Sequence, residues 1–143
     1  NLVFRRGFTA LDELQDPAPD YLAPLPIAYD PELPTYKRMV DMMGGHGGGS
    51  DNLPKAQAIK DATMAYFVSR NLPEEGLFMH INGSYHSDER EGIIWYLLEE
   101  YAPDAKIMSV TTVEQPDLQS LSEESTGKAD FTVVVIDTMT KTY

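Results

Sequence analysis

The residues best suited to chemistry follow one another in the segment Gly83-Ser84-Tyr85-His86. The short apolar run before it, residues 77–81, is typical of a buried strand, and Ser87 after it is a good N-cap for a helix. The loop that leaves the carboxyl end of a parallel strand is where open α/β sheets bind ligands. Imidazole ligates metals and titrates near neutral pH, and a phenolate can ligate haem iron. Tyr85 and His86 are therefore candidate ligands to a metal or haem iron, or acid–base groups, unless the loop only turns the chain.

A second candidate set lies on the long helix that we expect over residues 51–71. Gln57, Lys60, Asp61 and Met64 fall at i, i+3, i+4 and i+7, so they share one stripe of that helix. A solvated face also explains such a stripe, and it is the favoured interpretation for Lys60. The other three mix polar and apolar character, as in a helix that lines a cleft, which makes them candidate cofactor-binding residues.

The two remaining histidines have weaker patterns. His46 lies in the glycine-rich run 44–49, where it is either a solvated side chain or a group that closes over a bound cofactor. His80 lies inside the expected strand, and we expect it to be a core histidine or to support a ligand instead of being one.

The elements that would position these side chains alternate in the order of a parallel α/β fold. We expect strands over residues 77–81, 106–112 and 131–136. We expect helices over residues 4–14, 36–43 and 51–71, one that starts at Ser87, and a short one over 117–124. The predicted fold class is α/β, a parallel sheet with flanking helices plus a small helical subdomain.

The chain has two portions of different composition, which we expect to belong to one domain. Residues 1–50 are rich in Pro, Gly, Met and Tyr and form the helical subdomain portion, whereas residues 51–143 form the α/β portion of the same domain. Three strands make a small sheet, and the chain begins with Asn1 instead of Met. We therefore expect the chain to be the second half of a larger domain, and so an incomplete one.

Composition argues against several classes of function. A net charge of −12, from 11 basic and 23 acidic residues, argues against nucleic acid as a partner, because binding it requires a positive surface. The lack of cysteine in the sequence excludes disulfides, thiolate catalysis and cysteine zinc sites. No apolar run reaches the roughly 18 residues that a membrane-spanning helix requires, and no signal peptide is visible.

Taken together, the candidate residues resemble those of a known family. The most specific part is the helix segment 57–65 followed by the turn Gly83-x-x-His86, and Arg5, Arg6, residues 21–26 and the loop with His46 match more loosely. The chain is similar to the C-terminal part of the ChaN-like haem-binding uptake proteins, which are related to the Tiki and erythromycin-esterase groups. The resemblance implies an α/β fold, haem binding linked to iron uptake, and an exported bacterial lipoprotein, membrane-anchored or periplasmic. It also implies tyrosine ligation of haem iron, without assigning that tyrosine to a position.

Two functional hypotheses follow, with a plain interaction module as a third. The leading one is a non-catalytic haem binder in which Tyr85, His86 or His46 ligates the iron. The alternative is a metal-dependent hydrolase of the Tiki-like type, which holds a divalent metal ion with His86. Tiki-type enzymes resemble this pattern with two Gly-x-x-His motifs and a glutamate, and only the second motif is present here. We expect a small-molecule cofactor as partner, with an outer-membrane receptor and a second copy of the chain as candidate protein partners.

Overall fold

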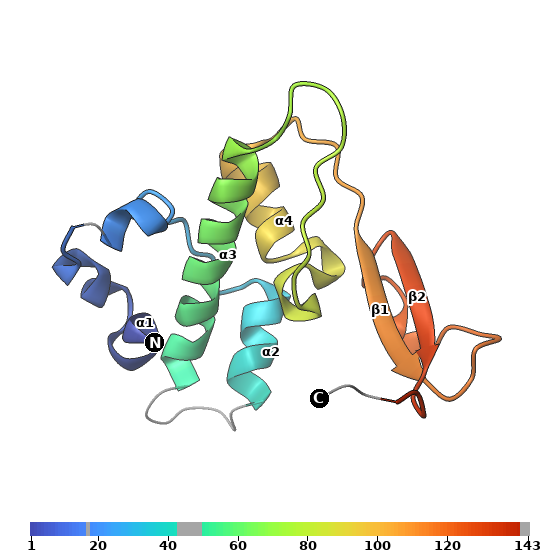
Figure 1. The fold of residues 1–143 in the computed structure, drawn as a ribbon. Coiled ribbons are helices and arrows are strands. Elements are labelled where there is room, and N and C mark those ends of the chain that lie inside the picture. The colour runs from blue at the N-terminus through green and yellow to red at the C-terminus, as the bar shows by residue number, and fades with distance from the viewer. Residues whose placement is uncertain (17, 43–49, 141–143) are drawn as a thin grey trace.

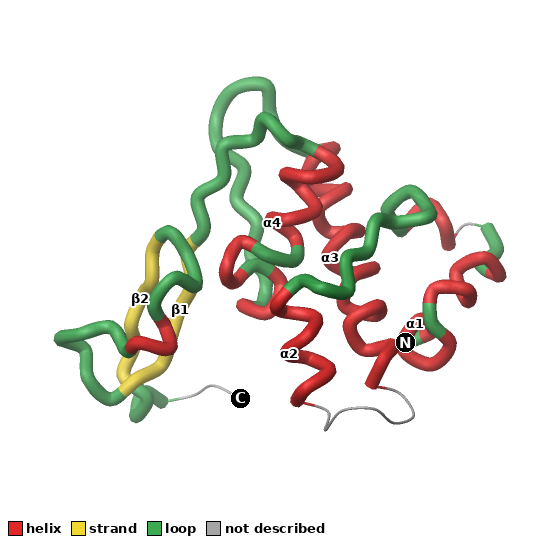
Figure 2. Tube along the Cα trace, turned by 180° about the vertical axis from the view of Figure 1, so that it is seen from behind, coloured by secondary structure: helices red, strands yellow, loops and turns green. Residues whose placement is uncertain are grey.

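The structure, a computed structural model, describes residues 1–16, 18–42 and 50–140 and has two parts (Figure 1). One part is a group of helices around the long helix α3 (Leu53–Arg70), and the other is a two-stranded sheet. The segment after α3 loops over one end of the molecule and then runs between α4 (Ile93–Tyr96) and the sheet, as two opposite views show (Figure 1, Figure 2).

The helices other than α3 are short. α1 (Leu2–Arg6) and α2 (Pro34–Met42) pack against α3, and α4 continues into a π-helical turn, Leu97–Tyr101. Short 3₁₀ segments cover Phe8–Glu13, Ala18–Tyr21, Ser50–Asn52, Ser84–His86, Asp88–Arg90 and Glu123–Ser125. Within the described residues, no helix has both the length and the apolar character needed to cross a membrane.

Small residues let α3 and α4 lie close together. Ala62 and Ala65 of α3 are fully buried and pack with Ile93 and Tyr96 of α4 in the main core cluster. The Tyr96 hydroxyl donates a hydrogen bond to the carbonyl oxygen of Ala28 over 2.7 Å, so the phenol is satisfied inside the core. This packing fixes the distance between α3 and the chain that enters α4.

The sheet is parallel, as the sequence predicts. β1 (Val110–Gln115) pairs with β2 (Phe131–Ile136) in register, with Val110 opposite Phe131. The strand expected over residues 131–136 is confirmed, whereas the one expected over 106–112 begins later, at Val110. The α/β class with a parallel sheet and flanking helices is therefore confirmed, although the sheet is smaller than expected.

The strand expected over residues 77–81 is wrong. The segment has no strand partner within the described residues. Leu77, Met79 and Ile81 are 83%, 74% and 85% exposed. An apolar run by itself does not distinguish a paired strand from an unpaired segment, because hydrophobicity says nothing about which backbone lies beside it. Among the described residues, the sheet has two strands instead of the expected three.

Positive φ angles explain why two expected helices are interrupted. The helix expected over residues 4–14 divides at Gly7, whose φ is 71°. The helix expected from Ser87 makes only a 3₁₀ turn before α4, because Glu89, Arg90 and Gly92 have φ between 54° and 61°. Such angles are incompatible with a right-handed helix.

The remaining helices differ from the prediction mainly in length. Those expected over residues 36–43 and 51–71 are confirmed as α2 and α3. The helix expected over 117–124 is reduced to the turn Glu123–Ser125. The division of the chain near residue 50 stays a prediction.

Candidate functional site

A contact between the buried Asp61 and the partly buried His86 forms the centre of the candidate site. Asp61 lies on α3 and is fully buried, and its Oδ1 is 2.5 Å from Nδ1 of His86. The hydroxyl of Tyr36 on α2 donates to Oδ2 of the same carboxylate over 3.3 Å. The carboxylate thus engages the Nδ1 side of the imidazole.

Gly92 makes room for this contact. Its φ is 54°, and a Cβ at this position would lie 2.4 Å from the carbonyl oxygen of His86 and 3.4 Å from Cγ of Asp61. Conformation and space therefore both exclude a side chain here. The glycine lets the turn that carries His86 lie against the start of α4 and beside α3.

Burial is the largest influence on the Asp61 carboxyl and raises its pKa, because the charged form is desolvated. The hydrogen bond and the charge of His86 lower this pKa, as does the hydrogen bond from Tyr36. Burial also raises the pKa of Tyr36 well above its ordinary range, so the phenol stays protonated and acts as a donor. The carboxyl therefore meets the imidazole in a largely dehydrated setting.

The amide of Gln57 lies beside the same imidazole. Its Nε2 is 2.7 Å from Nδ1 of His86 and 3.5 Å from Nε2 of that ring. A nitrogen that donates to Asp61 cannot also accept from an amide N–H, but a half turn of the Gln57 amide presents its oxygen to Nδ1–H instead. Gln57 thus restricts the ring from the same face of α3 as Asp61, one turn earlier in the helix.

A shallow hollow of about 350 Å³ opens beside His86. It is lined by Leu22, Ile59, Lys60, Thr63, Met64 and His86. Its surface is mainly apolar, and Lys60 is the solvent-exposed cation among the lining residues. The hollow thus combines a histidine, an apolar wall and a positive charge.

Comparison with known families decides which group of proteins this is. Residues 1–97 match the family described as "Haem-binding uptake, Tiki superfamily, ChaN". The chain belongs to this family. No curated protein and no solved structure matches it significantly. The family predicted from the sequence is thereby confirmed, and membership supports a general haem-binding role.

The structure brings together four of the residues that the sequence singled out. His86 contacts both Gln57 and Asp61, and Met64 lines the same hollow as His86. For a haem-binding family this is a coherent place for a cofactor, although the role of each residue stays a prediction.

Tyr85 does not share this place. Its side chain is 55% exposed, and its hydroxyl contacts Sδ of Met42 on α2 over 3.6 Å. Neighbouring residues of a 3₁₀ turn point in different directions, which separates Tyr85 from His86. The prediction for His46 falls outside the described residues.

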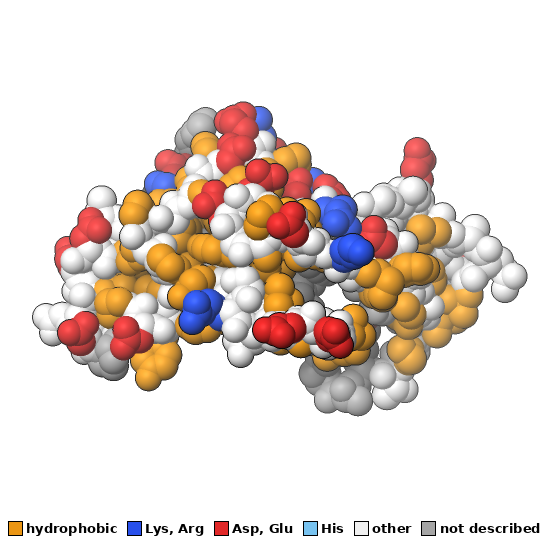
Figure 3. All heavy atoms as spheres, turned by 90° about the horizontal axis from the view of Figure 1, so that it is seen from above, with side chains coloured by type: hydrophobic (Ala, Val, Ile, Leu, Met, Phe, Trp, Pro, Cys, Tyr) orange, Lys and Arg blue, Asp and Glu red, His pale blue; other side chains and the backbone are white. Residues whose placement is uncertain are grey.

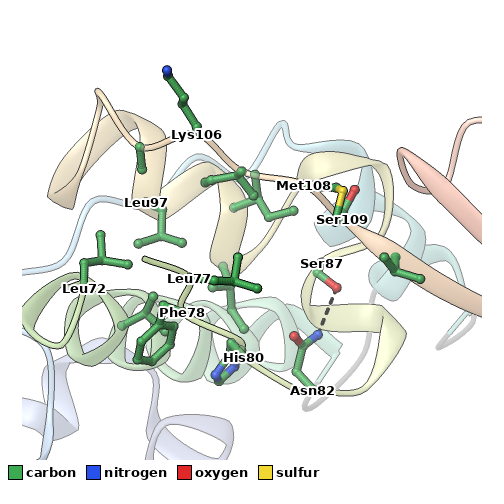
Figure 4. Close-up of a pocket in the computed structure, with 16 residues that line it drawn as sticks. Leu72, Leu77, Phe78, His80, Asn82, Ser87, Leu97, Lys106, Met108 and Ser109 are labelled. Atoms are coloured by element: carbon green, nitrogen blue, oxygen red, sulfur yellow. Dashed lines mark hydrogen bonds between the residues drawn. The ribbon is translucent and has the colours of Figure 1, made fainter. Parts of the chain in front are cut away.

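His80 is exposed, so the expectation of a core histidine is wrong, and its role in support of a ligand stays a prediction. Even so, partial burial is the largest effect on its pKa, which is lowered, and the charge of His86 acts in the same direction. His80 and Phe78 line a second, mainly apolar hollow of about 240 Å³, across from Met108 (Figure 4).

Sequence reasoning missed two residues of the site. Tyr36 carried no recognisable signal, because a lone tyrosine in the first turns of a helix is an ordinary core residue. The sequence favours a solvated face for Lys60, and this side chain is exposed, but it also lines the hollow. Its position beside Asp61 on the same helix stripe was the signal that could have found it.

The described residues contain no cluster of three or more His, Cys, Asp or Glu side chains that could hold a metal ion. The metal-ligand role predicted for His86 stays a prediction.

Proposed function

We propose that this chain binds haem in the hollow beside His86, with Nε2 of that residue as the iron ligand. The observation that carries the proposal is the 2.5 Å contact between Nδ1 of His86 and the buried Asp61 carboxyl. Metal-ligating histidines usually donate their other ring N–H to such a group, which fixes the tautomer and the ring orientation. Haem, when bound, would supply an iron centre with an open coordination position.

The rest of the hollow suits the same ligand. Leu22, Ile59 and Met64 offer apolar surface to a flat macrocycle, and Met side chains adapt well to such surfaces. The ammonium group of Lys60 is suited to a propionate at the solvent edge. These residues are suited to bind and orient a ligand, and we propose binding without catalysis.

The proposed biological role is iron uptake. It includes export of the protein as a membrane-anchored lipoprotein or periplasmic protein, and transfer of haem from or to an outer-membrane receptor. The support for this role is membership of the haem-binding uptake family. The net charge of −12 is compatible with a small cofactor that meets one local cation.

Titration with hemin, followed by the Soret band, tests the proposal. Wild-type protein is expected to give a saturable shift of the band, and His86→Ala is expected to lose it. The matched control is Tyr85→Phe, which changes the neighbouring aromatic residue and is expected to bind like the wild type.

Two results would overturn the assignment. A wild-type protein that gives no shift would remove the proposed function. Loss of the shift in Tyr85→Phe together with its retention in His86→Ala would move the iron ligand to Tyr85. Hydrolytic activity that a chelator abolishes would instead support the metal-dependent hydrolase.

A further inference from the structure

We propose that an extended, uncharged segment of another protein binds to this chain as an added strand, in the cleft between residues 77–82 and the free edge of β1. This edge cleft has a volume of about 620 Å³, and residues 77–82 line one side of it and residues 110–112 of β1 the other. It shares no lining residue with the hollow beside His86, so the inference is independent of haem binding.

The lining of the edge cleft shows that it runs along two backbone edges. Side chains of successive residues in an extended chain point to opposite faces. A cleft that every residue of 77–82 and of 110–112 lines therefore lies between the edges of the two segments instead of on one face. Phe78 is 37% exposed, against 83% and 74% for its neighbours Leu77 and Met79, which is the alternation of an extended chain.

Both backbone edges lack a strand partner. β1 pairs with β2 on one side only. Among the described residues, no backbone group of 77–82 is hydrogen-bonded to another backbone group. Such edges are templates for a further strand, and proteins usually protect them with charged residues or proline, neither of which occurs in residues 77–82. A polypeptide backbone placed between the two edges supplies the row of donors and acceptors that each of them needs.

The charge of the edge cleft restricts the sequence of the added strand. The described residues that line the cleft include no Asp, Glu, Lys or Arg, although charged residues make up 24% of the chain. Partial burial lowers the pKa of His80, so this lining residue is neutral at neutral pH. A charged side chain inserted here would find no partner. Glu74 and Glu75 are exposed just before the cleft, so a basic residue suits the end of the added strand.

A neighbouring hollow determines which side chains the added strand needs. This smaller hollow of about 240 Å³ shares Leu77, Phe78 and Met108 with the edge cleft and extends to Ile93 and Leu97 of the helical core (Figure 4). Every second side chain of an added strand points to this face. The partner segment should therefore carry apolar residues at alternate positions.

A synthetic peptide tests the inference on the whole chain. The probe is a fluorescently labelled peptide of about six alternating valine and threonine residues, the length of a common strand, followed by lysine. We expect saturable binding, measured by fluorescence anisotropy. The control peptide has proline at one central position, which removes a backbone donor, and we expect it to bind at least about tenfold more weakly.

Hydrogen exchange locates the bound peptide. An added strand pairs with both edges of the cleft, so we expect amide exchange in residues 77–82 and in residues 110–112 to slow at least about tenfold at saturating peptide. Apolar adhesion to the surface alone would not protect two separate segments of backbone.

Proline substitutions in the segment 77–82 provide matched variants. Since N–H groups of successive residues point to opposite edges, one of Met79→Pro and His80→Pro removes a donor from the cleft and the other does not. We expect one of these variants to bind the peptide at least about tenfold more weakly than the other. Met79→Ala and His80→Ala keep both donors and are expected to bind like the wild type.

The combined results decide the question. Binding that protects both segments and is lost in one proline variant supports the inference. Equal binding of the two peptides, protection of fewer than both segments, or equal binding by the two proline variants overturns it. Self-association that either proline variant abolishes would assign the edge cleft to a second copy, and displacement of the peptide by hemin would assign it to the cofactor. Both results would also overturn the inference, whereas a failure to bind hemin concerns only the proposed function.

Discussion

The helical part and the sheet part of this molecule differ in how completely they bury their apolar residues. Ile93 and Ala62 in the helical part are 3% and 0% exposed. Val110 and Phe131 in the sheet are 56% and 59% exposed, and hydrophobic side chains are visible over this part in the view from above (Figure 3). The candidate site lies wholly in the helical part, where close packing can hold two side chains at a fixed distance.

The two parts are joined by a few polar contacts at one turn. The backbone N–H of Glu89 donates to the carbonyl oxygen of Lys128 over 2.6 Å, and Arg90 pairs with Asp130 at 2.9 Å. The turn Asp88–Arg90 is separated from His86 by Ser87 alone. The sheet is therefore connected to the chain segment that carries the imidazole, but it does not touch the hollow.

We expect the largest difference in the free energy of unfolding between two isoleucine substitutions, one in the core of the helical part and one in the exposed segment 77–81. Ile93→Ala should lower the free energy of unfolding by about 2–5 kcal/mol, because it leaves a cavity between α3 and α4. Ile81→Ala should change it by less than about 0.5 kcal/mol, because that side chain is 85% exposed. Urea unfolding measures both, and equal losses would show that residues 77–81 are packed in solution.

A second pair of substitutions tests whether the site requires a glycine at position 92. Gly92→Ala should lower the free energy of unfolding by about 1–3 kcal/mol, and it should weaken hemin binding, because the new Cβ would meet the His86 carbonyl. Gly83→Ala is the control, since its φ is −71° and no atom lies within 4 Å of the added Cβ. Thermal unfolding and hemin titration test the pair, and a similar loss in both variants would contradict this account.

Loss of one contact between the two parts should have a smaller effect. The Thr111 hydroxyl donates to Oδ1 of Asp88 over 3.0 Å, and Thr111→Val removes this bond while keeping the branched shape. We expect a loss of about 0.5–1.5 kcal/mol. Urea unfolding measures it, and hemin affinity should not change, because the contact lies outside the hollow. A fall in affinity would mean that the sheet controls the site.

The smallest expected effect on stability comes from Asp130 and depends on pH. The backbone N–H of Ser109 and then its hydroxyl donate to Asp130 and hold the pKa of that carboxyl below its usual range, with Arg90 adding to this. A folded pKa below the unfolded one stabilises the fold above the ordinary value of about 3.9. That contribution is lost as the pH falls through the lower, folded value.

Asp130→Asn should therefore be less stable than the wild type at neutral pH and equal to it in strong acid. Urea midpoints measured across the acid range check this sign. A difference between the two proteins that grows as the pH falls would contradict it.

Parts of the site could be predicted because they depend on local spacing. Gln57, Asp61 and Met64 share a helix stripe whatever the rest of the chain does, since the period of an α-helix fixes it. His86 was identifiable from its place in a glycine-containing turn. In contrast, Tyr85 had equally good chemistry and an adjacent position, and the structure directs it to Met42 instead.

The sequence by itself determined the family, the long helix α3 and the strand β2. It also determined the two segments that supply site residues, the stripe of α3 and the turn that ends at His86. Each of these depends on a periodic pattern or a short motif. Only the tertiary structure decided that Asp61 meets His86, 25 residues away, that Tyr36 binds the second oxygen, and that residues 77–81 are unpaired. Contacts between distant segments depend on how helices pack and where a side chain is missing, as at Gly92. No local pattern contains that information, because the same stripe or turn is compatible with many partners.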